Sequence, residues 1–355
     1  MASFQQNQHQ AYIDMLNKYK KLLPPFTDAY LTSLATKEIR TQAQYCYEVA
    51  RFLTYTVERP AAANVDSGSA VQSVPTDSVQ KSTTNITIDD LARMNHQDIN
   101  RYLAFLINEH GYTSASVKKI LTALNSFFTY LEISEQISSN PVRMAMKPGN
   151  KDKLDIIHLE RAEMDELCQI VANDPNMTEH RKPYYTKTCL RDLAIITMLL
   201  FSGIRVSECA GIDLTDVDLK NHEFKVSRKG YNKKSKQQIT MHNDVFLTLK
   251  NYMEVREKMT PVAGDENALF LSLQNKRMGI RSIEKMVKKY AIDLSPSKDN
   301  ITPHKLRASF ATALYAKTHD IYLVAAALNH VSVETTVRHY TSINSERRKE
   351  AYTTL

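Results

Sequence analysis

The residues with the clearest chemical potential lie between positions 304 and 340, near the C-terminal end of a 355-residue chain. His304 and Arg307 stand three residues apart, and His330 follows an apolar passage. Tyr340 closes the stretch, and Arg205 stands far upstream in the segment Gly-Ile-Arg-Val-Ser-Glu. Arginine and histidine bind phosphate through charged or polar N–H groups, and a tyrosine hydroxyl can attack phosphorus. The combination predicts a site that cleaves a phosphodiester.

Cleavage of a DNA backbone without water requires a nucleophile, neutralisation of the non-bridging oxygens and a proton for the departing oxygen. The planar forks of Arg205 and Arg307 are the predicted clamps on those oxygens. A tyrosine with a free pKa of about 10 needs such a cationic pocket to react as phenolate near neutral pH. Tyr340 is therefore the predicted nucleophile.

Further residues could support this reaction. Pro303 can begin a helix, so His304 and Arg307 would face the same way, near a helix N-terminus that favours an anion. His330 could donate another hydrogen bond to the phosphate. Lys229, at the tip of a predicted hairpin, could protonate the leaving oxygen, since desolvation and nearby cations lower a lysine pKa. Glu208, one helical turn after Arg205, is predicted to orient cationic groups.

Each of these residues has an ordinary structural explanation when it is taken alone. A His-x-x-Arg pair occurs on many helix surfaces, a lysine in a turn is usually solvated, and the chain holds 18 tyrosines. A lone histidine is more often a packing or capping residue than a ligand. The prediction therefore depends on the order and spacing of the whole set.

The N-terminal part, residues 1–146, reads as a helical bundle. Helices are predicted over residues 1–23 and 39–58, from Asn95 onward, and from Ser114 or Thr113 onward, because apolar residues recur at helical spacing behind capping residues. Residues 61–87 show no periodic spacing of apolar residues, which indicates a flexible insertion. Lys118 and Lys119 lie on the predicted bundle surface and are expected to contact DNA, although a charged helix surface is usually only solvated.

Residues 147–154 are polar and contain Pro and Gly, which indicates a linker. The pattern of residues 155–355 predicts an α+β domain. Helices are expected at 159–171, 193–201, 244–258 and 281–292, with strands at 223–228, 237–241 and 268–271. The first two strands form a hairpin. Its turn carries further lysines that are candidates for DNA contact: Lys233, Lys234 and Lys236.

Composition sets broad limits. The formal charge of +7, from 46 Lys and Arg against 39 Asp and Glu, is compatible with a polyanionic partner without requiring one. The four cysteines form no Cys-x-x-Cys pair, which argues against a common zinc site and against a disulfide scaffold. No apolar run reaches the roughly 18 residues of a membrane span. We therefore expect a cytoplasmic protein.

The complete set resembles the tyrosine recombinases, also called the phage integrase family. The residues that carry this resemblance are the Gly-Ile-Arg-Val-Ser-Glu box at 203–208, a hairpin lysine before a glycine, and Thr335-Thr336 ahead of the tyrosine; the catalytic set is Arg205, Lys229, His304, Arg307, His330 and Tyr340. The match is strong over 155–345, and the N-terminal helices are similar to the family's core-binding domain. No separate arm-binding domain is evident, which favours a two-domain, Xer-like build.

The resemblance implies a clamp on double-stranded DNA, a 3′-phosphotyrosine intermediate, a Holliday junction and a homotetramer on paired sites. It implies no metal and no nucleotide cofactor, and it allows an accessory DNA-bending or directionality protein. The charged tail at 344–352 is expected to dock on a neighbouring protomer, with a frayed terminus as the alternative. Two features depart from the family: Asn329 replaces the usual glycine, and the tyrosine lies ten residues after His330.

Asparagine tolerates left-handed backbone angles, so the replacement of glycine is expected to preserve activity. Two other functions stay open: a type IB topoisomerase-like relaxase, and a catalytically silent DNA-binding protein. A metal-dependent nuclease is disfavoured because no carboxylate cluster stands out. The target site, and the choice between integration or excision of a mobile element and dimer resolution, are not readable from the chain.

Overall fold

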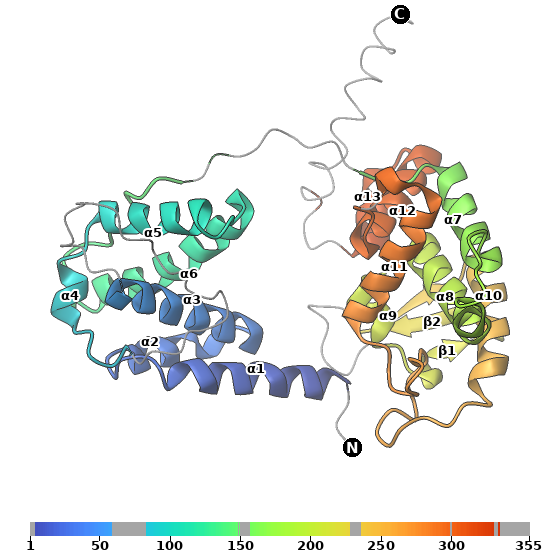
Figure 1. Ribbon diagram of the computed structural model, residues 1–355, viewed down its shortest axis with the longest axis horizontal. Helices are drawn as coiled ribbons and strands as arrows, with labels where there is room; N and C mark the ends of the chain where they lie inside the picture. The colour runs from blue at the N-terminus through green and yellow to red at the C-terminus, as the bar shows by residue number, and fades with distance from the viewer. Residues whose placement is uncertain are drawn as a thin grey trace, which may run out of the picture. The chain divides into compact units, whose positions relative to one another are not determined.

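A computed structural model describes residues 4–58, 83–147, 149, 157–227, 236–298, 300–329 and 333. The chain divides into two compact units, residues 2–154 and 155–355, and Figure 1 shows the elements of each. Only residues 83–87 of the predicted insertion and residues 147 and 149 of the predicted linker are described. The remainder of both segments, and the predicted tail at 344–352, lie outside the described residues.

The N-terminal unit is helical. Its elements are α1 (Phe4–Lys20), α2 (Thr27–Ser33), the 3₁₀ turn η1 (Leu34–Thr36), α3 (Ile39–Glu58), α4 (Ile88–Ala92), α5 (His96–Asn108) and α6 (Ser114–Ile133). The helices α3, α5 and α6 bring together an aromatic core, in which Phe52 contacts Tyr102 and Phe128 edge-on. This burial stabilises the helices, because helical stability in proteins comes mostly from tertiary packing of the apolar face.

Helix capping follows the sequence closely in this unit. Asn95 accepts a hydrogen bond from Gln97, and Asp98 accepts one from the Asn95 backbone, so the predicted start of α5 is confirmed. Thr113 caps α6 and is one of the two start residues predicted for it. The short helices α2 and α4 were not predicted, because each is too short to show a clear apolar period.

The C-terminal unit is mainly helical with a small sheet, which confirms the predicted fold class. Its elements are α7 (Arg161–Asn173), α8 (Lys182–Ser202), α9 (Val206–Ala210), η2 (Leu214–Asp216), β1 (Val217–Asp218), β2 (Glu223–Val226), β3 (Gln237–Thr240), α10 (Asn243–Arg256), α11 (Ile280–Leu294), η3 (Pro296–Lys298), α12 (Pro303–Thr318) and α13 (Ile321–Leu328). Helix α8 is buried over residues 194–202 and packs against α7, α10 and α12, so it forms the centre of the unit.

The sheet is antiparallel, in the order β1-β2-β3, with Val226 opposite Gln237 at the end where the hairpin loop begins. The prediction of a strand at 268–271 is wrong, because this segment forms only isolated bridges, such as that between Asp213 and Ala268. Side chains take the place of a strand ladder there. The Tyr252 hydroxyl donates to Leu269 O and accepts from Leu271 N, and Arg256 donates to Ala268 O.

All four cysteines are free thiols. Cys46 and Cys209 are buried, and burial raises the pKa of each to about 12. Cys168 is half-buried, and desolvation likewise raises the pKa of its thiol to about 12. Cys46 and Cys209 pack as small core side chains, as expected, whereas Cys168 and Cys189 are half-buried. Within the described ranges, no helix is long and apolar enough to cross a bilayer.

Candidate active site

Gly203 makes the turn that presents Arg205. It ends α8 in the left-handed region, at φ 62° and ψ 20°, which glycine adopts without strain. A Cβ at this position would also overlap the ring of Phe310 on α12. Glycine is thus required twice, by backbone angle and by close packing. The predicted helix break before Arg205 is confirmed.

Arg205 is the N-cap residue of α9, and the carboxylate of Glu208 binds both its backbone and its side chain. The backbone N–H of Arg205 donates to Glu208 Oε2 at 2.8 Å, and its Nη1 donates to Glu208 Oε1 at 2.8 Å. The Glu208 side chain is 4% exposed, whereas that of Arg205 is 39% exposed. A buried carboxylate therefore fixes a guanidinium whose other face reaches solvent. This is the geometry expected if Glu208 orients Arg205.

Helix α12 carries His304 and Arg307, and Pro303 begins it as predicted. His304 is exposed in the first turn, whereas Arg307, one turn later, is only 3% exposed. Arg307 Nη1 donates to Gly203 O at 2.6 Å, and its Nη2 donates to Leu328 O. Its guanidinium therefore connects the turn before Arg205 with the last residue of α13.

The end of α13 leads directly toward His330. Asn329 caps the helix at φ 48° and ψ 53°, in the left-handed region, and its N–H donates to carbonyls in the last turn. The expectation that Asn329 can take the backbone angles of a glycine is confirmed. The residues that follow it, His330 and the nucleophile candidate Tyr340, lie outside the described residues, as does Lys229.

Arg307 thus brings together three segments that are far apart in the chain: the Gly203–Arg205 turn, α12, and the end of α13. The structure places the described members of the predicted set, Arg205, His304 and Arg307, on adjoining elements. Helix α11 packs against both α9 and α12 beside them. This assembly can present guanidinium and imidazole groups to one anion.

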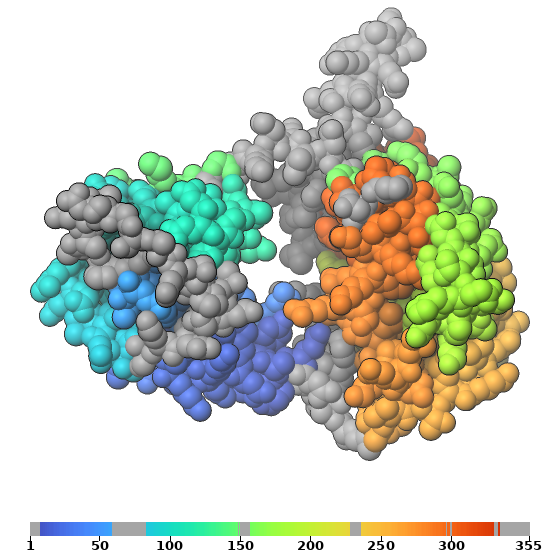
Figure 2. Space-filling model, in the orientation of Figure 1, coloured from blue at the N-terminus to red at the C-terminus, as the bar shows by residue number. Residues whose placement is uncertain are grey.

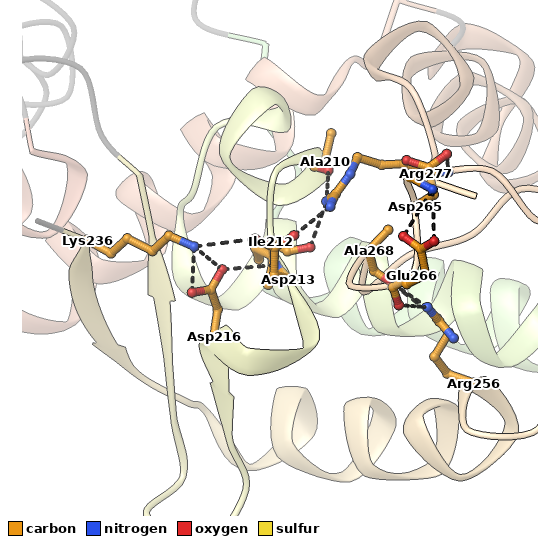
Figure 3. Close-up of polar contacts among 11 residues, drawn as sticks. Ala210, Ile212, Asp213, Asp216, Lys236, Arg256, Asp265, Glu266, Ala268 and Arg277 are labelled. Atoms are coloured by element: carbon orange, nitrogen blue, oxygen red, sulfur yellow. Dashed lines mark hydrogen bonds and ion pairs between the residues drawn. The ribbon is translucent and has the colours of Figure 1, made fainter. Parts of the chain in front are cut away.

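The lysines predicted to contact DNA have different surroundings. On α6, Lys118 is half-buried and Lys119 is exposed. Lys236 has two internal partners: its Nζ lies 2.5 and 2.6 Å from the two carboxylate oxygens of Asp216, and 3.6 Å from Asp213 (Figure 3). Lys233 and Lys234 are not among the described residues. A DNA contact by any of these lysines stays a prediction.

Helix α11 carries a basic surface that was not predicted from the sequence. Its exposed residues recur at helical spacing, and four of them are cations: Arg281, Lys285, Lys288 and Lys289. At about 100° per residue these side chains share one side of the helix, opposite the buried Ile283, Val287 and Tyr290. We call them the α11 basic stripe. A helical-wheel count of charges over 281–289 would have found it.

A model of the phage integrase family matches residues 159–347, and a model of the phage integrase N-terminal SAM-like domain matches residues 26–137. The tyrosine recombinase XerS of Streptococcus uberis is 29% identical over 369 residues, covering 96% of this chain and 97% of that protein. XerS of Lactococcus lactis subsp. cremoris MG1363 is 28% identical over 373 residues, covering 97% and 98%.

Solved structures with a similar fold include two DNA complexes. The XerH site-specific recombinase bound to its difH substrate has a TM-score of 0.58 and 20% identity, covering 88% of this chain and 79% of that one. The Tn1549 transposon integrase with circular intermediate DNA has a TM-score of 0.59 and 17% identity, covering 84% and 98%. At these identities the likeness concerns the fold.

Proposed function

The chain belongs to the phage integrase family of tyrosine recombinases, and from this premise we propose that it breaks and rejoins double-stranded DNA at specific sites, with Tyr340 as nucleophile. The observation that supports this most directly is the Arg307 guanidinium, which gathers the Arg205 turn and the end of α13 around α12. DNA as partner is supported by the DNA-bound relatives XerH and Tn1549 integrase.

The proposed reaction is a phosphoryl transfer without hydrolysis. The Tyr340 hydroxyl loses its proton to solvent and its oxygen forms a bond to phosphorus. The bond from phosphorus to the 5′ oxygen breaks, and the strand stays attached as a 3′-phosphotyrosine. Lys229 supplies the proton that the departing 5′ oxygen takes up. Attack by a 5′ hydroxyl on the phosphotyrosine reverses these steps and reseals a strand, so no external energy source enters the balance.

Arg205 and Arg307 neutralise the non-bridging oxygens in this proposal, and His304 and His330 donate further hydrogen bonds. Arg205 suits this role because Glu208 fixes it while 39% of its side chain remains exposed. Arg307 adds a positive charge in a buried setting, where weak screening increases its effect on a nearby phosphate. The cluster of cations also favours the phenolate of Tyr340 over the phenol.

The α11 basic stripe is the proposed contact to the DNA backbone beside the site. Helix α11 packs against α9, which begins after Arg205, and against α12, which carries His304. Its surface, orange in Figure 2, is open to solvent on the face in view. Cations at this spacing neutralise successive phosphates and release their counterions. We propose that the stripe holds the duplex while the site acts on one phosphate.

The proposed active assembly is a homotetramer on two paired sites. Exchange between two duplexes requires cleavage of every strand, and each cleavage consumes one tyrosine nucleophile. Four copies therefore satisfy the chemistry, and closed symmetric assemblies are the usual arrangement of identical chains. An accessory DNA-bending or directionality protein could determine which sites pair.

Covalent trapping tests the proposal. In a nicked suicide substrate, the short fragment that carries the new 5′ hydroxyl diffuses away after cleavage, which should leave DNA attached to the protein at Tyr340. Tyr340→Phe should bind the same DNA with unchanged Kd and form no adduct. Cleavage by the Phe variant would contradict the assignment. Relaxation of supercoiled DNA by a monomer, independent of sequence, would favour the relaxase instead.

A further inference from the structure

Lys236 belongs to a network of ion pairs that we call the hairpin clasp: Lys236, Asp213, Asp216 and Arg277. Lys236 Nζ lies 2.5 Å from Asp216 Oδ2 and 3.6 Å from Asp213 Oδ2. The other carboxylate oxygen of Asp213 accepts from Arg277 Nη2 at 2.5 Å. Figure 3 shows Asp213 between the two cations, so that one carboxylate is shared by both.

The clasp acts at one end of the β2–β3 hairpin. Val226 and Gln237 are the last paired residues on the loop side, and Lys236 immediately precedes Gln237. The ion pairs therefore attach the returning strand to η2 at the point where the loop joins the sheet. The Asp216 side chain is 7% exposed and that of Lys236 is 32% exposed, so the pair is partly shielded from water.

The same network reaches the helix that follows Arg205. Arg277 Nη1 donates to Ala210 O at 3.2 Å and to Ile212 O at 3.0 Å, and Ala210 is the last residue of α9. Helix α9 begins directly after Arg205. This chain of contacts thus links the end of the β2–β3 hairpin with the last residue of α9.

We propose that Lys236 is a positioning residue that sets the hairpin loop relative to Arg205. This inference rests on the proposed function, in which Lys229 of that loop protonates the leaving oxygen. Proton transfer demands an approach within hydrogen-bond reach, and a misplacement of about 1 Å can cost on the order of 100-fold in rate. We infer that ion pairs at Lys236, where the loop joins β3, restrict the positions available to Lys229.

The clasp also gives Lys236 a different role from the DNA contact predicted from sequence. A phosphate would have to compete with two carboxylates that already neutralise the ammonium group. Loss of a DNA contact would weaken binding and reduce the salt dependence of Kd. Loss of a positioning contact would instead slow cleavage at saturating DNA. The two roles therefore predict different measurements.

The test uses Lys236→Met and Asp216→Asn in the full chain, with Lys225→Met on the exposed side of β2 as matched control. Single-turnover cleavage is measured at saturating DNA with an ordinary substrate and with one whose 5′ bridging oxygen is replaced by sulfur. A thiolate leaves without protonation, so the sulfur substrate does not require a general acid. Both clasp variants should cleave the ordinary substrate about 10- to 100-fold more slowly, and the sulfur substrate at nearly the wild-type rate.

Lys229→Ala should show the same pattern of rescue, and Lys225→Met should resemble wild type. A Lys236→Arg variant, which can keep the ion pair, should retain activity, and thermal unfolding checks that each variant is folded. A Lys236→Met defect that sulfur does not rescue, or one confined to Kd, would overturn the positioning role. Failure of the wild-type protein to cleave either substrate would instead reject the proposed function.

Discussion

Arg307 donates a 2.6 Å hydrogen bond to the carbonyl oxygen of Gly203, 104 residues earlier in the chain. The same guanidinium donates to Leu328 O, so one buried side chain holds two backbone segments. Arginine can do this because its planar fork carries several N–H donors in fixed directions. A residue proposed to act on phosphate therefore also organises the backbone around the site.

Arg307→Met is expected to destabilise the protein as well as abolish cleavage. The substitution leaves two buried carbonyl oxygens without this donor, and we expect a loss of about 2 to 4 kcal/mol in the free energy of unfolding. Urea unfolding followed by circular dichroism measures it. Arg101→Met removes an exposed ion pair with Asp98 and should cost less than about 1 kcal/mol. Equal losses in both variants would argue against the organising role.

Gly203→Ala should be strongly destabilising, by about 2 to 4 kcal/mol, because it adds strain at positive φ to an overlap with Phe310. A second substitution, Phe310→Leu, should restore the free energy of unfolding that is lost through overlap with the ring. It should not restore the free energy that is lost through backbone strain. The comparison of the single and double variants by urea unfolding separates the two terms. Gly279→Ala is the matched control, since its φ is −79° and a Cβ there meets nothing within 4 Å.

Acid is expected to weaken the contact between α7 and η3. Lys298 Nζ lies 2.8 Å from Glu163 Oε1, and this hydrogen bond lowers the pKa of the Glu163 carboxyl below its ordinary value of 4.5. With the folded pKa lowered, the stabilisation is complete above pH 4.5 and is lost as the pH falls through the folded pKa.

The corresponding measurement compares wild type with Glu163→Gln across the acidic range. The difference in free energy of unfolding should be largest near neutral pH and should shrink as the pH falls below 4.5. Glu166→Gln, on the same helix, controls for the change in net charge. A difference that stays constant with pH would show that the ion pair contributes nothing to the acid response.

Lys285→Ala and Lys288→Ala in the α11 basic stripe should weaken DNA binding in proportion to the phosphates they contact. Each lost contact is expected to reduce the slope of log K against log salt by about 0.9. Fluorescence anisotropy at several salt concentrations measures this slope. Lys250→Ala, an exposed lysine on α10, should leave it unchanged. An unchanged slope in both stripe variants would place the duplex elsewhere.

The sequence alone determined the features that depend on local pattern. The cap of α5 at Asn95, the helix break at Gly203 and the left-handed Asn329 follow from residue type and near neighbours, because capping and backbone angles are short-range effects. The order of Arg205, His304 and Arg307 likewise indicated the chemistry. The two strands of the hairpin were readable from alternation.

Only the tertiary structure decided which distant groups meet. The bonds from Arg307 to Gly203 and Leu328, and the side-chain contacts that replace a strand at 268–271, involve backbone carbonyls, which are present at every residue and leave no signature in the sequence. The sequence predicts Lys236 as a DNA contact, whereas the fold pairs its ammonium group with Asp216. A charge in the sequence does not specify its partner, because that partner is chosen by the folded path of the whole chain.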